Sequence, residues 1–472
     1  MHRRIITCFV AAVGSFAVDL PASAGTLFVD ANLATGANDG TSWVDAFRGS
    51  GGLQSALALA VAGDEIWVAD GMYKPTATLD RTIAFDMKSG VAILGGFAGG
   101  ETLASQARPE TNVAILSGDL DDNDDDFGGY PFGENSHHVV RGAGADATAI
   151  LDGLTIQSGL GIGYGGGLFM VEASDGTIRR CTLRNNLAIF SGGGSVHVRE
   201  SQPTFTDCRL VENSAFYWGG AIDMRGNGDA TFERCVFEHN SAPNGGAVHI
   251  HGSQARFSNC LFFHNGADEE GGGAIRVRAA TLYIQNCTIT RNSATKGGTG
   301  GGILATTSLV DVSNSILYRN WAYPVGGQGS PSDIAGQLVS ARYSCVDGGY
   351  PGPGNTSGPP MFVNSTFFGL PDFRLQVGSP CIDAGDNAAV PAGVVLDLTR
   401  APRFIDHPAA DNVGPNIRPP VDMGAFETQA PIASYCFGDS LEGHCPCSNE
   451  SYRGGCSNSL GVGGVLNRAF GR

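Results

Sequence analysis

Apolar and polar residues alternate in short runs through the middle of the chain, as in AIDM (221–224) and CVF (235–237). Successive side chains of a β-strand point to opposite sides, so this alternation predicts short strands with one buried face. Asp223 and Val236 are predicted to point away from the core. The inward face is predicted to contain Ile222, Met224, Cys235 and Phe237.

The alternation recurs with a period of 25 to 28 residues. A cysteine marks each copy, an Asn follows five positions later, and a Gly-Gly pair comes next. A fixed period of this kind indicates stacked units, each of which buries its apolar face only against its neighbours. The cysteine column is Cys181, Cys208, Cys235, Cys260 and Cys287, with Ser315 in the next place, and the Asn column is Asn186, Asn213, Asn240, Asn265, Asn292 and Asn320.

A parallel β-helix accounts best for this repeat. Gly pairs and β-branched runs exclude helical repeats, and propeller blades are longer, at about 40 residues. Neighbouring coils of a β-helix lie about 4.8 Å apart. The Asn column is predicted at a corner, where Asn adopts unusual backbone angles and its amide bonds to the next coil, while His239 faces solvent. The Gly pairs form the next corner, and the cysteines are predicted to be buried free thiols.

The repeat resembles a known family. FEHN with GGAV, FFHN with GGAI and ITRN with GGIL are similar to the FxxN and GGA[ILV] repeats of polymorphic outer-membrane proteins, over about residues 150–324. Repeats of this kind occur in bacterial right-handed β-helix proteins. The resemblance implies that fold together with surface display and adhesion.

The N-terminal region is predicted to contain an export signal and a cap. Residues 1–24 combine two arginines, an apolar stretch and Ala22-Ser23-Ala24, as a cleaved secretory signal does. Residues 53–61 form a predicted amphipathic helix, with Leu53, Ala56, Leu57, Ala60 and Val61 on one face. The helix and the strand after it resemble the N-terminal cap of pectate-lyase-like β-helices. GVAILGGF and NVAILSGDL are predicted to form early coils, so residues 25–150 are the cap and first coils.

The C-terminal region resembles another bacterial module. PDFRLQVGSPCIDAGD and VDMGAFE are similar to the choice-of-anchor Q region that closes many β-helix surface proteins. The expected organisation is therefore regular repeats over 151–324, irregular coils over 325–430 and a Cys-rich tail over 431–472. The fold class is all-β: a right-handed, pectate-lyase-like parallel β-helix with a short N-terminal capping helix and a small Cys-rich tail.

Export implies an oxidising compartment, in which disulfides form. In the tail, the spacing C-x8-C-x-C-x8-C favours two disulfides over a zinc site, with the connectivity left open. The tail cysteines are Cys436, Cys445, Cys447 and Cys456, and Cys345 and Cys381 are further candidates for a disulfide.

The net charge of −17 argues against nucleic acid and anionic membranes as partners. It is compatible with cations and neutral glycans. An acidic run, DLDDNDDD (119–126), is a candidate Ca²⁺ site because crowded carboxylates repel one another unless a cation neutralises them. The run departs from the EF-hand pattern. The alternative is a solvated acidic loop. Its candidate ligands are Asp119, Asp121, Asp122, Asp124, Asp125 and Asp126. No cofactor is expected to be required.

Two polar columns follow the Gly pairs and are predicted to face outward. The first runs through Met170, His197, Asp223, His249, Arg276 and Ala305. Asp223 could accept hydrogen bonds from both histidines, which makes His197, Asp223 and His249 weak catalytic candidates. The second column lies two places further along each strand and contains Arg199, Arg225 and Arg278. This strip of arginines would favour carboxylate groups such as uronic acids. The binding candidates are Arg199, Arg225, Arg276 and Arg278.

Two functions are compatible with these features. The first is an exported extracellular or outer-membrane-associated scaffold or adhesin, non-enzymatic, that binds surface glycans or another cell-surface component. The second is a polysaccharide lyase or glycoside hydrolase that acts on an acidic polysaccharide from an outer face of the β-helix. The fold hosts both classes, so the fold alone does not decide between them. After signal removal, no integral membrane segment is expected.

Overall fold

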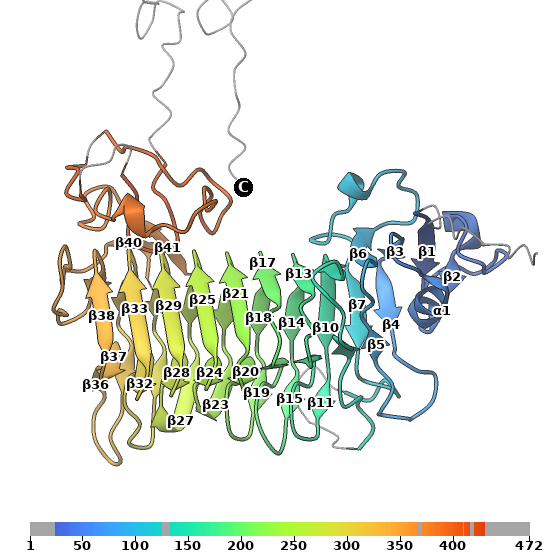
Figure 1. The fold of residues 1–472 in the computed structure, drawn as a ribbon, viewed down its shortest axis with the longest axis horizontal. Helices are drawn as coiled ribbons and strands as arrows, with labels where there is room; N and C mark the ends of the chain where they lie inside the picture. Colours follow the sequence, from blue (N-terminus) through green and yellow to red (C-terminus); the bar gives the residue numbers. More distant parts are fainter. Residues whose placement is uncertain (1–23, 125–132, 366–370, 409, 416–419, 430–472) are drawn as a thin grey trace, which may run out of the picture.

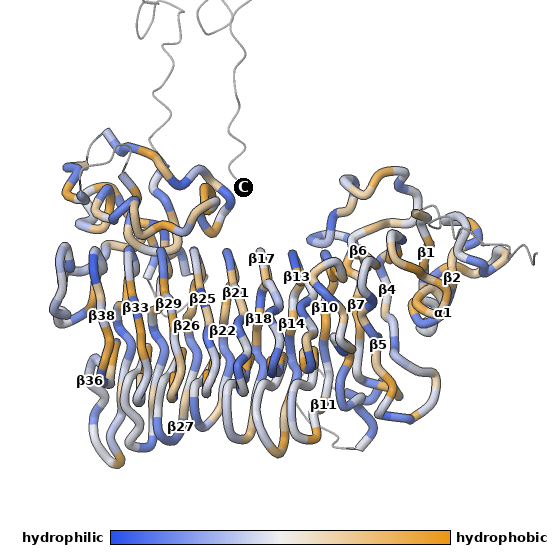
Figure 2. Tube along the Cα trace, viewed as in Figure 1, coloured by the Kyte–Doolittle hydropathy of each residue, from blue (hydrophilic) through white to orange (hydrophobic). Residues whose placement is uncertain are grey.

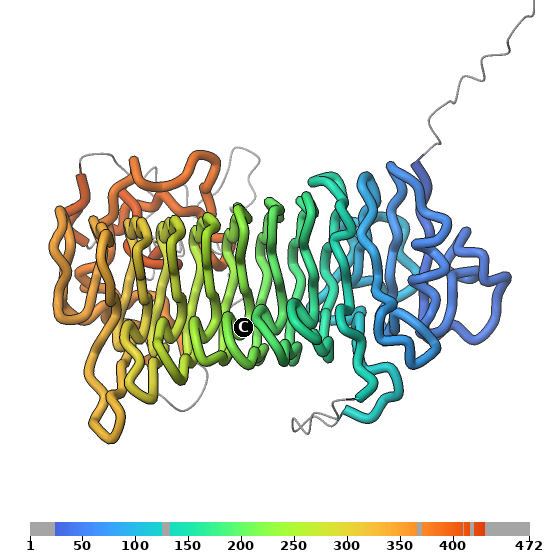
Figure 3. Tube along the Cα trace, turned by 60° about the horizontal axis from the view of Figure 1, so that its bottom comes forward, coloured from blue at the N-terminus to red at the C-terminus, as the bar shows by residue number. Residues whose placement is uncertain are grey.

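A computed structural model describes residues 24–124, 133–365, 371–408, 410–415 and 420–429. The chain winds into one elongated solenoid whose coils stack side by side along the long axis (Figures 1 and 3). Each regular coil contributes one strand to each of four sheets, which we number I to IV in the order the chain visits them. All neighbouring strands in the regular coils are parallel, so the predicted parallel β-helix is confirmed.

Sheet I contains β2 (Phe47–Arg48), β1 (Thr26–Asp30), β3 (Glu65–Ala69), β6 (Ala92–Phe97), β9 (Ile150–Asp152), β13 (Thr177–Arg179), β17 (Thr204–Thr206), β21 (Asp229–Glu233), β25 (Gln254–Ser258), β29 (Thr281–Gln285), β33 (Leu309–Ser313) and β38 (Val339–Arg342). Sheet II contains β4 (Gly71–Tyr73), β7 (Ala114–Ser117), β10 (Leu154–Gln157), β14 (Thr182–Arg184), β18 (Arg209–Val211), β22 (Val236–Glu238), β26 (Leu261–Phe263), β30 (Thr288–Thr290), β34 (Ile316–Tyr318) and β39 (Cys345–Val346).

Sheet III contains β11 (Leu160–Gly161), β15 (Leu187–Ala188), β19 (Ser214–Ala215), β23 (Ser241–Asn244), β27 (Gly266–Gly271), β31 (Ser293–Ala294), β35 (Trp321–Ala322) and β36 (Ser330–Pro331). Sheet IV contains β5 (Phe85–Asp86), β8 (Val140–Arg141), β12 (Leu168–Val171), β16 (Val196–Arg199), β20 (Ile222–Arg225), β24 (Val248–His251), β28 (Ile275–Arg278), β32 (Ile303–Thr306) and β37 (Ile334–Gly336). β40 (Phe362–Asn364) and β41 (Asp372–Leu375) form a separate antiparallel pair.

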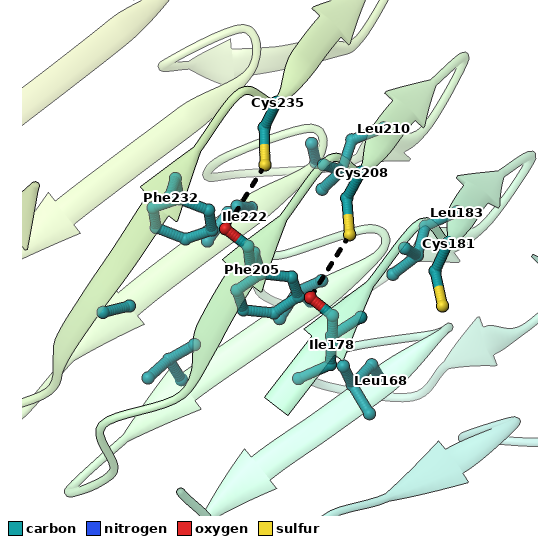
Figure 4. Packing of buried hydrophobic residues seen from close by; sticks show 14 of the residues in the cluster. Leu168, Ile178, Cys181, Leu183, Phe205, Cys208, Leu210, Ile222, Phe232 and Cys235 are labelled. Carbon is teal, nitrogen blue, oxygen red and sulfur yellow. Dashed lines mark hydrogen bonds between the residues drawn. The ribbon is translucent and has the colours of Figure 1, made fainter. Parts of the chain in front are cut away.

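The core is a set of columns of like side chains, because equivalent positions of successive coils lie one above the other. Phe205, Phe232 and Phe257 stack with ring centroids 4.9 and 4.6 Å apart. The five repeat cysteines are buried as free thiols, as predicted. Figure 4 shows three of them, Cys181, Cys208 and Cys235, beside the stacked rings. The Sγ of Cys235 donates to the carbonyl of Phe205, so each thiol also meets a backbone group of the preceding coil.

The Asn column forms a hydrogen-bonded ladder. The Oδ1 of Asn240 accepts from the backbone N–H and the amide of Asn213, and its own amide donates to the Leu210 carbonyl and to Asn265. The predicted bonding between coils is confirmed. The predicted backbone angle is wrong, however: the left-handed residue is the one before each Asn, such as His239 with φ of 52°. The Asn side chain is therefore aimed inward by the turn that its neighbour makes.

Both ends of the solenoid are covered. At the N-terminal end, the helix α1 (Gly52–Leu59) buries Leu53, Ala56 and Leu57, as the apolar face predicts. The helix ends before Val61, which is 49% exposed, so that residue was wrongly placed on the buried face. At the other end, the Tyr350 hydroxyl and the Asn355 amide donate to carbonyls of β38, which satisfies acceptors of the last strand.

The C-terminal segment, by which we mean the described part of residues 371–429, packs on the outer face of sheet II, and Figure 1 shows it on one flank of the solenoid. Phe373 and Met423 pack there against Leu261 and Ile316 of the sheet. Apolar and polar stretches alternate along this segment, as they do along the coils (Figure 2). None of the helices within the described residues combines the length and apolar composition needed to cross a membrane. Residues 1–23 of the predicted signal (1–24) and the predicted Cys-rich tail (431–472) lie outside the described residues.

Candidate functional site

The predicted His–Asp column lies on sheet IV, on the side away from the core. His197, Asp223 and His249 are paired in register on β16, β20 and β24. The two ends of the column differ from the prediction. Phe169 and Leu304 occupy the end positions, whereas Met170 and Ala305, which were predicted there, point into the core. The Gly-rich corners vary by one residue at the two ends of the repeat, which shifts the alignment there.

Asp223 is the centre of a buried charge cluster. Its side chain accepts hydrogen bonds from His249 Nδ1 at 2.7 Å and from Arg225 Nε at 2.7 Å. His197 Nδ1 lies 3.4 Å from Oδ2 but without hydrogen-bond geometry, so this contact is electrostatic. Burial alone would raise the pKa of Asp223, but the two histidines outweigh burial and lower the pKa. Asp223 is thus an ionised group held by three cationic or polar partners.

The cluster is closed off from solvent. Asp223 is 0% and His197 1% exposed, because the turns between sheets III and IV fold back over this face. Tyr164 stacks on His197 at 4.1 Å, and Arg225 lies 4.1 Å from the Trp218 ring. Glycine permits this close cover, since a Cβ on Gly192 would lie 3.0 Å from the Asp223 side chain. A substrate has no access to these candidates as they stand.

The four candidate arginines do not form one surface. Arg199 and Arg278 are exposed, Arg225 is half-buried in the Asp223 cluster, and Arg276 is buried. Arg276 donates to Asn244 of β23 and to Glu270 of β27, next to the covering turns. The predicted uronate-binding strip therefore divides into two exposed residues and two that tie the cover to the sheet.

The acidic run makes internal bonds. Asp119 accepts from the backbone N–H groups of Asn123 and Asp124, and Asp122 pairs with Lys74 at 2.7 Å. Within the described part of the chain, no three His, Cys, Asp or Glu side chains are placed to hold a metal ion. Asp125 and Asp126 lie outside that part, so the Ca²⁺ site stays a prediction.

The structure describes two of the six cysteines that are candidates for disulfides. Cys345 and Cys381 are buried free thiols in one apolar cluster between sheet II and the C-terminal segment. The Cys345 thiol, followed by burial, raises the pKa of Cys381. The four tail cysteines lie outside the described residues.

A different surface has the shape of a binding site. A groove of about 930 Å³ runs along the corner between sheets II and III, and we call it the corner groove. Four residues that directly follow strands β22, β26, β30 and β34 contribute one side chain per coil. They are His239, His264, Arg291 and Arg319, and the aromatic side chains of Tyr318, Trp321 and Tyr323 line the groove with them.

The groove concentrates positive charge. Burial, and then the neighbouring Arg319, lower the pKa of Arg291, so the two guanidinium groups repel each other. Arg319 lies 5.4 Å from the Tyr318 ring and forms no ion pair with any residue the structure describes. The Glu238 side chain raises the pKa of His239 at one end. Asp347 is the only carboxylate among the described lining residues.

Sequence reasoning missed this groove. The column before the Asn ladder reads Asn185, Glu212, His239, His264, Arg291 and Arg319, and it shows no constant chemistry along its length. The charge gathers only in its C-terminal half. The usable signal was the run YRNWAY, in which aromatic residues flank an arginine at the same corner.

One comparison with protein families supports the fold. A family model described as "Right handed beta helix region" matches residues 199–338. Among solved structures, the crystal structure of pectate lyase Pel9A matches at 14% identity with a TM-score of 0.43, over 86% of this chain and 97% of that chain. No curated protein matches the sequence. The fold is thus a parallel β-helix, and the family match over residues 199–338 supports its right hand.

Proposed function

We propose that the protein is an exported, non-enzymatic cell-surface scaffold that binds an acidic glycan in the corner groove. The observation that carries the proposal is the combination of two neighbouring guanidinium groups with aromatic faces in one groove. Arginine pairs with carboxylates in bidentate fashion, and aromatic rings offer apolar faces to sugar rings. The resemblance of the repeats and of the closing region to bacterial surface proteins supports export and display.

The groove geometry suits an extended chain of sugars. Its four corner residues come from successive coils, which are spaced by about 4.8 Å. A chain laid along the solenoid axis would therefore meet one histidine or arginine side chain per coil, with the two arginines in neighbouring coils. Relief of the repulsion between Arg291 and Arg319 by a bound carboxylate adds to the affinity.

The enzymatic alternative has less support. Glycoside hydrolysis ordinarily needs a pair of carboxylates, and the described lining of the groove has only Asp347. The catalytic candidate Asp223 is fully buried under Trp218 and Tyr164. A binding function requires neither a second acid nor access to Asp223.

The test is a glycan array with the mature protein, followed by affinity measurements on uronic-acid oligomers of increasing length. Arg319→Ala is expected to weaken binding of acidic oligomers about tenfold and to spare neutral ones, since a charge-assisted bond contributes about 1.5–3 kcal/mol. Trp321→Ala is expected to weaken both. Arg256→Ala, on sheet I, is the charge-matched control and should change neither.

Two outcomes would contradict the proposal. One is equal binding by the wild type, Arg319→Ala and Trp321→Ala. The other is turnover, seen as new reducing ends or unsaturated uronides, that Asp223→Asn or Asp347→Asn abolishes.

A further inference from the structure

The wall of the corner groove contains two side chains of the kind that titrates near neutral pH. His239 and His264 directly follow β22 and β26, and Arg291 and Arg319 continue the same row after β30 and β34. All four have a left-handed backbone, with φ between 52° and 58°, so successive coils present them at the same corner. Half of the row is therefore permanently charged, and the other half changes its charge with pH.

Acidic groups face His239 at the N-terminal end of the row. The Nδ1 of His239 lies 3.4 Å from Glu238, which raises the pKa of the imidazole, and Glu212 of the preceding coil adds to this effect. Glu238 also pairs with Arg209 at 3.1 Å, so an arginine already balances that carboxylate. A proton on His239 therefore adds positive charge to this end of the groove.

His264 has mainly cationic neighbours. Partial burial, followed by His239 and Arg291, lowers the pKa of His264, and Glu238 opposes these effects without outweighing them. The rings of His239 and His264 lie 4.9 Å apart, so a proton on one disfavours a proton on the other. A carboxylate bound in the groove beside His264 would supply the missing negative charge and raise its pKa.

A buried carboxyl behind the groove also titrates near neutral pH. Burial raises the pKa of Asp333 to about 7. Its Oδ2 accepts from the backbone N–H of Asp347 in the groove lining, and its Oδ1 accepts from Asn320. Asp333 is buried, so its side chain does not reach a ligand in the groove. Asp333→Asn keeps the shape of this side chain and separates its titration from that of the histidines.

We propose that His239 and His264 make the binding of an acidic glycan in the corner groove pH-dependent, with tighter binding in mildly acidic surroundings. The inference rests on the proposed function. Carboxylates ordinarily titrate near pH 4, so those of the glycan stay ionised from about pH 5.5 to about pH 7.5. Because a bound carboxylate raises the pKa of each histidine, the complex takes up protons, and the affinity rises as the pH falls through this range.

The test measures the affinity of oligogalacturonate for the mature protein by calorimetry at about pH 5.5 and about pH 7.5. A neighbouring opposite charge shifts a pKa by about one unit or more, so the wild type should bind about tenfold more tightly at the lower pH. Titrations in two buffers of different ionisation enthalpy should show net uptake of protons on binding. His239→Gln combined with His264→Gln should remove both the pH dependence and the proton uptake.

Three further variants serve as controls. His251→Gln changes an exposed histidine of β24 on sheet IV and should leave the pH dependence intact. Asp333→Asn should leave it intact as well. Arg319→Ala removes a permanent charge from the row, so it should weaken binding at both pH values by a similar factor.

The results separate this inference from the proposed function. Binding that depends on Arg319 but is equally tight at both pH values would overturn the inference and leave the proposed function standing. Absence of oligogalacturonate binding at either pH would overturn both. A pH dependence that survives the double histidine variant, or that Asp333→Asn abolishes, would assign the titration to another group and would also overturn the inference.

Discussion

Removal of one Asn from the ladder tests how the coils are held together. Asn240 is 1% exposed, and its side chain bonds to the two neighbouring coils. Asn240→Ala deletes the acceptor of the Asn213 backbone N–H and the donor to the Leu210 carbonyl. Both groups are buried, so no solvent replaces the lost partner. Asn265 Oδ1 retains the bond from the residue 240 N–H, which limits the damage on that side.

The magnitude follows from these two orphaned groups. A buried polar group without its partner costs about 1–3 kcal/mol, so two groups cost about 2–6 kcal/mol. The free energy of unfolding from urea titrations, followed by circular dichroism and tryptophan fluorescence, measures this loss. Hydrogen exchange should place the loosened amides in the coils on either side of Asn240, because each coil contacts only its neighbours.

His239→Ala is the matched control in the adjacent position. The His239 side chain is 49% exposed and contacts Glu238 at 3.4 Å, so its removal should change stability by no more than about 0.5 kcal/mol. A larger loss for His239→Ala than for Asn240→Ala would refute the reasoning. It would mean that the turn residue, rather than the amide ladder, sets the energetics of the corner.

Three further outcomes are expected. Burial raises the pKa of Asp333 to about 7, so the folded protein holds a proton that the unfolded chain releases near pH 4. The free energy of unfolding should therefore fall by up to about 4 kcal/mol as the pH rises from 4 to 7. In urea titrations, Asp333→Asn should flatten this fall. Oxidative refolding should join Cys345 to Cys381, and non-reducing peptide mapping that finds both still reduced would contradict this. Asp223→Asn should cost about 3–5 kcal/mol in the same titrations because Arg225 and His249 lose their buried counter-charge, and a loss below about 1 kcal/mol would show that the cluster carries little stability.

The repeat was predictable because equivalent positions of successive coils share one environment. The column of Cys208 and Cys235 must hold a small, buried side chain in every coil, so spacing alone reveals it. Period-two alternation likewise placed Ile222 in the core correctly. The backbone of the corner was not predictable, since the left-handed turn falls on residues as different as Glu212 and Arg319.

The candidate site was harder to predict, because alternation tells only which side of a strand a residue faces. Asp223 does point away from the core, as predicted, yet it is buried. Its cover comes from a turn whose path depends on glycine at 192 and on the ring of Trp218. The corner groove likewise joins His239 to Asp347, which are far apart in sequence. A local sequence pattern does not show which distant residues come together in the fold.

The covers on the solenoid determine where a ligand can bind. Sheet IV is closed by its own turns, and the C-terminal half of sheet II is closed by the C-terminal segment through residues such as Phe373. The corner groove lies at the margin of that segment, where Phe373 packs near Arg291. A loosened attachment of the segment should therefore weaken uronide binding while the β-helix itself stays folded.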